Sequence, residues 1–191
     1  MTGKNKEKEV LEEGNKEMWN KRWDLKETFF SNFKNPLILD LPGFSYNLKV
    51  HEKSRKDLKR FFEAKTKEEK EKIRKEYNQD AFNHHREIKE IFLSALNRNY
   101  DFILGYFCVA DVIGHLNFGN NIIMKAIYKD LDEIATIINQ RERIRTIILS
   151  DHGMKPVGDF GDHSGYGFWS TNFKELSSPR ITEFASLILS L

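Results

Sequence analysis

Apolar residues occur in short runs that charged segments separate. Leu37 to Leu41 form a brief apolar run closed by Pro42 and Gly43, which predicts a buried strand that enters a turn. Residues 101–110, DFILGYFCVA, form a continuous apolar run, as expected of a parallel strand covered on both faces. Residues 144–149 predict another buried strand, and 166–172, YGFWSTN, predict a late one. The pattern therefore indicates several short strands along the second half of the chain.

Helical periodicity appears between and around these strands. Residues 121–139 carry apolar side chains at helical spacing, and 181–191 predict a closing amphipathic helix. The order strand, helix, strand is a βαβ unit, which implies a parallel sheet. Residues 54–97 are also helical by period, but their middle is highly charged, so we expect a solvated, cap-like helix or helix pair. The first thirty residues predict a helix with Trp19 and Trp23 on one face. We expect a single α/β domain over residues 1–191.

Composition narrows the possible functions. The 31 basic residues almost balance the 29 acidic residues, for a net charge of +2, which argues against a nucleic-acid recognition surface. The single cysteine, Cys108, excludes an internal disulfide, and its apolar surroundings predict a buried, inert thiol. No apolar stretch approaches the roughly 20 residues that a membrane helix needs. The charged start shows no secretory signal, so a cytoplasmic location is the expectation.

Acids and histidines follow two of the predicted strands. Asp111 and His115 come after the first strand, and Asp151 and His152 after the second. Ligand sites of open α/β sheets lie outside the carboxyl ends of their strands, so these pairs should meet at one edge. His163 follows in a glycine-rich stretch that can fold back over that edge. Two carboxylates and three imidazoles suit zinc, manganese or iron better than calcium or magnesium.

Each cluster also has a plainer interpretation. Asp111 and Asp151 could each cap a helix, and the stretch around His163 could be an ordinary surface loop. The clusters favour a metal site only when they are taken together at neighbouring strand ends. The other histidines carry no such pattern: His51 is expected in a charged loop, and His84 and His85 are adjacent on a helix and so point to different faces.

Three motifs, ADVIGH, LSDHGM and GDHSGYG, together resemble the alkaline-phosphatase superfamily. The resemblance is closest to its type I phosphodiesterase and nucleotide pyrophosphatase branch, including the archaeal phosphodiesterase-like proteins. It implies a three-layer α/β sandwich with a mostly parallel central sheet and two metal ions, zinc or manganese, at the carboxyl edge. Asp111, His115 and His163 would bind one metal. Asp151 and His152 would help to bind the second.

The resemblance implies a metal-dependent phosphohydrolase that acts on phosphate esters. The family's first strand carries a further metal-binding Asp, followed by a Ser or Thr nucleophile, and no residue here matches them, so the catalytic residue is not assigned. We therefore expect a sheet that is truncated at its N-terminal side. A homodimer or a partner chain could cover the open sheet edge. Two alternatives to a complete enzyme remain: a catalytically incomplete metal-binding remnant, and one half of a split phosphodiesterase.

Overall fold

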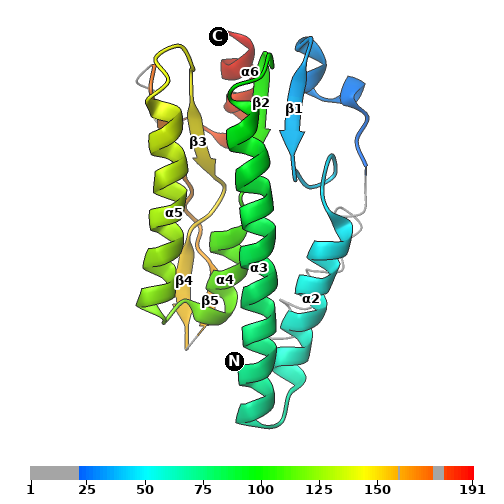
Figure 1. Ribbon diagram of the computed structural model, residues 1–191, viewed down its shortest axis with the longest axis vertical. Helices are drawn as coiled ribbons and strands as arrows, with labels where there is room; N and C mark the ends of the chain where they lie inside the picture. Colours follow the sequence, from blue (N-terminus) through cyan, green and yellow to red (C-terminus); the bar gives the residue numbers. More distant parts are fainter. Residues whose placement is uncertain (1–21, 159, 174–178) are drawn as a thin grey trace.

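A long helical hairpin runs the length of the molecule. The computed structural model describes residues 22–158, 160–173 and 179–191. Helix α2 (Leu48–Glu63) and helix α3 (Lys67–Ala95) pack side by side in antiparallel directions (Figure 1). The turn between them ends in a capping box, in which Thr66 and Glu69 exchange side-chain to backbone hydrogen bonds. The predicted helical segment 54–97 is therefore a helix pair, and α3 continues along the body of the protein.

Two further helices pack against the hairpin. Helix α4 (Val109–Asn117) lies between α3 and the strands, and helix α5 (Asn121–Asn139) follows after Asn120, whose side chain caps it. The observed bounds of α5 coincide with the predicted helix. Its buried face presents apolar residues at helical spacing: Met124, Ile127, Ile134 and Ile138.

The described strands pair in three separate two-stranded sheets. Strands β1 (Pro36–Leu39) and β2 (Phe102–Gly105) are parallel. Strand β3 (Ile147–Ser150) pairs antiparallel with β6 (Phe168–Thr171), and β4 (Met154–Val157) pairs antiparallel with β5 (Phe160–His163). The fold is thus mixed α/β, but a three-layer sandwich with a mostly parallel central sheet is not confirmed. The strand expected to extend to residue 110 ends at Gly105, because α4 begins at Val109.

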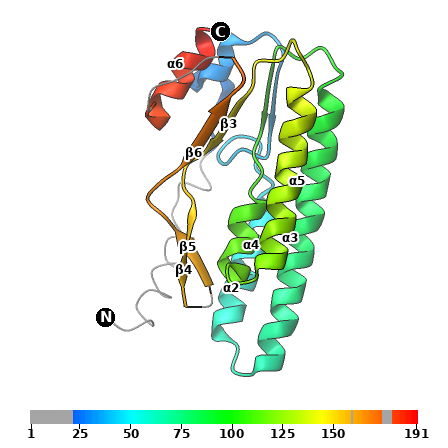
Figure 2. The same cartoon turned by 90° about the vertical axis from the view of Figure 1, so that its left-hand side faces the viewer.

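The strand pairs do not join into one continuous sheet, and two of them lie along one side of the helices. Figure 2 shows the β3–β6 and β4–β5 pairs following one another along the long axis, with α3 and α5 on one side. The closing segment, a 3₁₀ turn (Ile181–Glu183) followed by α6 (Phe184–Leu189), packs near the 3₁₀ turn Phe29–Asn32. The predicted N-terminal helix falls largely outside the described residues, Trp19 included, and residues 25–32 form two short 3₁₀ turns.

Most of the buried apolar residues form three clusters along α3. One centres on Phe61 and Tyr77, the second on Ile113 and Ile127, and the third on Phe92 and Ile134. Strand β3 is less well covered, since Ile148 and Leu149 are both more than a third exposed. None of the described helices combines the length and the apolar character that crossing a lipid bilayer requires.

Candidate metal centre

Helix α4 supplies the first two side chains of the site. Asp111 and His115 lie four residues apart, so both project from the same face of the helix. The Nε2 atom of His115 lies 3.4 Å from Oδ1 of Asp111. Asp111 is about one third exposed and His115 is mostly buried. The helical geometry expected of this pair is therefore present.

The β4–β5 hairpin brings His163 to α4. His163 ends β5 and pairs in register with Met154, the first residue of β4. Strand β5 packs directly on α4, and Nε2 of His163 lies 3.1 Å from Oδ1 of Asp111. The placement of His163 therefore follows from a short hairpin that packs against α4.

Glycines permit the close approach of the hairpin to α4. A Cβ on Gly161 would lie 2.6 Å from the carbonyl oxygen of Gly114, nearer than real Cβ atoms come to other heavy atoms. A Cβ on Gly114 would instead meet the side chain of Met154. Both glycines therefore let β4, β5 and α4 touch beside His115 and His163.

His152 completes the group from the loop after β3. Its ring stacks on that of His163, with centroids 3.8 Å apart and planes inclined by 19°. Gly153 fixes this arrangement: its N–H donates to the carbonyl of Tyr166, and its own carbonyl accepts from the N–H of Ser164. Two residues shortly after His163 are thereby tied to the residue after His152.

Asp151 lies at the margin of the group. Its side chain is 68% exposed, and its Oδ1 lies 3.7 Å from Nε2 of His152. Ligand atoms of Asp111, His152 and His163 all lie within 4.8 Å of one another, and neither His115 nor Asp151 belongs to that set. His115 adjoins the group through its contact with Asp111, and Asp151 adjoins it through His152.

Backbone carbonyls orient two of the imidazoles. The Nδ1 of His115 faces the carbonyl of Gly161 at 3.3 Å, and the Nδ1 of His152 faces the carbonyl of Gly153 at 3.1 Å. A carbonyl can only accept, so each Nδ1 carries the proton in these contacts. In the neutral ring, Nε2 then carries the lone pair that a metal can take. Metal-binding histidines typically carry a carbonyl or carboxylate partner of this kind.

Charge reinforces the arrangement around Asp111. Burial alone would raise the pKa of Asp111, but the hydrogen bond from His163 and the nearby imidazoles outweigh it and hold this pKa below its usual range. The same hydrogen bond raises the pKa of His163, against the opposing effect of burial. Asp111 is thus an anion that draws positive charge to the site.

The donor set and spacing fit a divalent transition metal. Zinc binds imidazole nitrogen and carboxylate oxygen at about 2.0–2.2 Å in tetrahedral sites, so neighbouring ligand atoms lie about 3.3 Å apart. The observed separations from Oδ1 of Asp111 are 3.1 Å to His163 and 3.4 Å to His115. Each of these two nitrogens therefore lies at about the tetrahedral spacing from Asp111.

Comparison with known proteins identifies the family. Residues 6–173 match the family described as "Type I phosphodiesterase / nucleotide pyrophosphatase", which is more than half of the chain. The chain belongs to this family. A search of curated proteins and a search of solved structures each found no match.

Membership agrees with the resemblance drawn from the three motifs. The resemblance implied that His152 and His163 of this phosphodiesterase bind neighbouring metals, and that division stays a prediction. In the structure the two rings stack, and His152 shares one potential ligand group with Asp111 and His163. The antiparallel β4–β5 pair, which sequence reasoning did not predict, is the reason for this proximity.

A second cluster was missed by sequence reasoning. Ligand atoms of Asp40, His51, His84 and Cys108 also lie within 4.8 Å of one another. His51 was expected in a charged loop, but it lies in α2 and is 4% exposed. Only Asp40 carried a signal: like Asp151, it directly follows the end of a strand.

Proposed function

We propose that this protein is a divalent-metal-dependent phosphohydrolase that acts on phosphodiesters. The observation that carries the proposal is the convergence of the Asp111 carboxylate with the Nε2 atoms of His115 and His163 and the ring of His152. Membership in the type I phosphodiesterase family supports the substrate class. Zinc or manganese is the proposed metal, since both accept this mixture of nitrogen and oxygen ligands.

The metal would polarise a phosphoryl oxygen and stabilise the charge that develops on it. Asp111, His152 and His163 would hold the ion, with His115 as an additional ligand. His163 is 46% exposed, so the site faces solvent and a phosphate ester can approach it. The carbonyls of Gly161 and Gly153 would orient the rings of His115 and His152 through their Nδ1 atoms, which leaves each Nε2 for the metal.

A two-metal arrangement is the finer form of this proposal. Asp151 lies beside His152 and could join it at a second ion. Two ions about 3.5–4 Å apart can stabilise both the attacking and the leaving oxygen of an in-line displacement. The nucleophile is not assigned to any residue of this chain.

Hydrolysis of model esters tests the function. The purified chain, loaded with zinc or manganese, should release p-nitrophenol from bis-p-nitrophenyl phosphate. Asp111→Asn and His163→Ala should each lower the rate at least about 100-fold, because loss of a direct ligand should cost no less than loss of its supporting contacts. p-Nitrophenyl phosphate, assayed in parallel, distinguishes diesterase from monoesterase activity.

Asp130→Asn is the matched control. Asp130 also accepts a hydrogen bond from a histidine, His85, at 2.6 Å, but it lies on α5 and outside the site. Its variant should retain the wild-type rate. If the wild-type protein bound metal but hydrolysed neither ester, the proposal that this chain is active by itself would be contradicted. That result would favour a metal-binding remnant or one half of an enzyme that needs a second chain. Metal content unaffected by His163→Ala would contradict the ligand assignment itself.

A further inference from the structure

Four side chains from four segments converge at a buried point between the helices. Asp40 follows β1, His51 comes from α2, His84 from α3, and Cys108 immediately precedes α4. Asp40, His51 and His84 are each at most 6% exposed. One oxygen, nitrogen or sulfur atom from each residue lies within 4.8 Å of the other three.

Asp40 is the centre of this group. Its Oδ2 accepts from Nε2 of both His51, at 2.9 Å, and His84, at 2.7 Å, and its Oδ1 accepts from the N–H of Asn47 at 3.0 Å. Burial would raise the pKa of Asp40, but these hydrogen bonds together hold it far below its usual range, so the carboxylate is charged. Its backbone has a φ of 56°, in the left-handed region that non-glycine residues seldom adopt.

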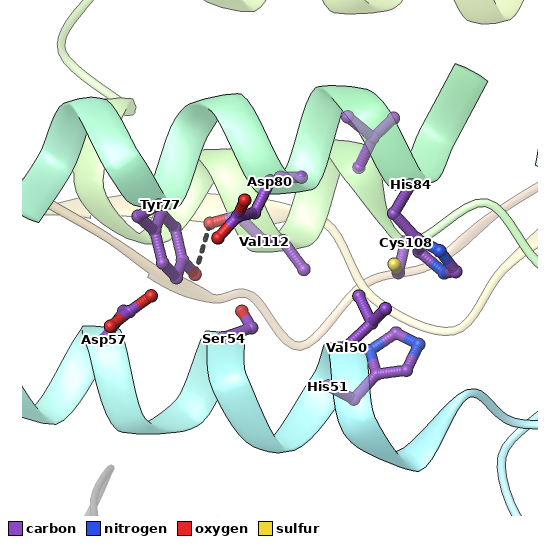
Figure 3. A pocket seen from close by; sticks show the side chains of 11 residues that line it. Val50, His51, Ser54, Asp57, Tyr77, Asp80, His84, Cys108 and Val112 are labelled. Atoms are coloured by element: carbon purple, nitrogen blue, oxygen red, sulfur yellow. Dashed lines mark hydrogen bonds between the residues drawn. The ribbon is translucent and has the colours of Figure 1, made fainter. Parts of the chain in front are cut away.

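The hydrogen bonds of this group are incomplete. The Nδ1 atom of His84 is buried and has no hydrogen-bond partner among the described residues, which is costly for a polar atom. A cavity of about 20 Å³ adjoins the group and is lined by His51, His84 and Cys108 among others. Figure 3 shows the side chains of these three residues gathered at one end of the cavity, between α2 and α3. Such a volume holds one water molecule or one ion.

We propose that Asp40, His51, His84 and Cys108 form a buried, four-ligand site for a transition metal of the zinc type. One carboxylate, two imidazoles and one thiolate make a closed donor set, as structural zinc sites have. Tetrahedral ligation places neighbouring ligand atoms about 3.3 Å apart, so Oδ2 of Asp40 and the two Nε2 atoms would separate by about 0.5 Å. The soft sulfur ligand disfavours magnesium and calcium.

This site differs from the candidate metal centre in its ligand atoms, in its exposure to solvent and in its proposed structural role. The candidate metal centre has no sulfur ligand and faces solvent, whereas the buried site is closed by α2, α3 and α4. The ion would join the end of β1 to three helices. One of them is α4, which carries Asp111 and His115, so the buried ion would hold the helix of the candidate metal centre in place without contacting substrate.

Cobalt substitution tests the proposal on the full chain. Cys108 is the only cysteine of the sequence, so a near-ultraviolet thiolate-to-cobalt charge-transfer band can arise at this site alone. The band should appear when metal-free wild-type protein takes up Co²⁺. It should be lost in Cys108→Ser and persist in His163→Ala, which alters only the candidate metal centre.

Metal counting gives the second measurement. His84→Ala should lose one bound zinc ion per chain, whereas His85→Ala should lose none. His85 is the matched control, because it is the adjacent residue, is similarly buried and pairs with Asp130 outside the cluster. Folded wild-type protein that binds no cobalt, or binds it without the thiolate band, would overturn the proposal and leave a metal-free hydrogen-bonded cluster. That result does not depend on whether any variant folds.

Discussion

At the scale of single residues, Asp111 is the side chain that contacts two histidines of the candidate metal centre. One oxygen, Oδ1, faces Nε2 of His163 at 3.1 Å and Nε2 of His115 at 3.4 Å. Without a metal, the proton of His163 occupies the contact that an ion would take. Protons and metal therefore compete for the same atoms, as at other histidine sites.

The pH dependence of stability follows from this pair. In metal-free protein, the lowered pKa of Asp111 and the raised pKa of His163 stabilise the fold between about pH 3.9 and about pH 6.5, the unfolded-state values. The contribution is lost as pH rises through the folded pKa of His163, above 6.5, or falls through that of Asp111, below 3.9. Because His163 is 46% exposed, we expect less than about 1 kcal/mol.

Denaturant unfolding in a chelator measures this effect. The difference in free energy of unfolding between wild type and His163→Ala should be larger at pH 5.5 than at pH 8.5. An equal difference at both values would mean that the ion pair contributes nothing and that the histidine acts only by packing.

At the scale of elements, the contact between α4 and the β4–β5 hairpin shapes the site. Gly161→Ala should destabilise the protein by about 1–3 kcal/mol, because its methyl group would collide with the backbone carbonyl of Gly114. Gly114→Ala should destabilise the protein less. Its methyl group would meet the flexible side chain of Met154, and alanine has a higher helix propensity than glycine. Thermal unfolding and zinc titration of both variants test this order.

The comparison of Gly161→Ala with Gly114→Ala decides whether the contact between hairpin and helix positions the site. The Gly161 variant should also bind zinc more weakly, because the hairpin that carries His163 moves away from Asp111. If both alanine variants were equally stable and bound zinc equally well, the close packing of hairpin and helix would not position the site.

Sequence patterns were sufficient for local structure and for part of the site. The periodicity of residues 121–139 predicted α5, and the four-residue spacing of Asp111 and His115 predicted their shared face. Pairing between strands was not predictable, because the apolar runs do not specify a partner and β3 joins β6. The cluster around Asp40 was not predictable for a similar reason. His84 lies 44 residues from Asp40 in sequence, so only tertiary packing makes the two side chains neighbours.

At the scale of the whole molecule, the apolar core is divided into three clusters. Phe61 is fully buried and packs edge-to-face on Phe160, at the start of the strand that carries His163. Ile138 belongs to the cluster at the opposite end of α3. The two residues therefore offer a comparison between a core position near the site and one remote from it.

Phe61→Ala should lower the free energy of unfolding by about 3–5 kcal/mol, and Ile138→Ala by about 2–5 kcal/mol. Where both variants are folded, only Phe61→Ala should weaken zinc binding at the candidate metal centre, because it removes support from β5. Denaturant unfolding and calorimetric titration measure the two quantities. Equal losses of zinc affinity in both variants would show that the clusters act as one cooperative unit.

The parallel pairing of β1 with β2 also bears on how the chain folds. Asp101, just before β2, accepts hydrogen bonds from the N–H groups of Lys34 and Asn35, and the second contact spans 66 residues of sequence. Pairing over such a distance requires closing a long loop, which is entropically unfavourable and slow. The α2–α3 hairpin shortens that loop once it forms, since it returns the chain to its starting end. Refolding should therefore begin in the helical hairpin, and the two strands should meet only afterwards.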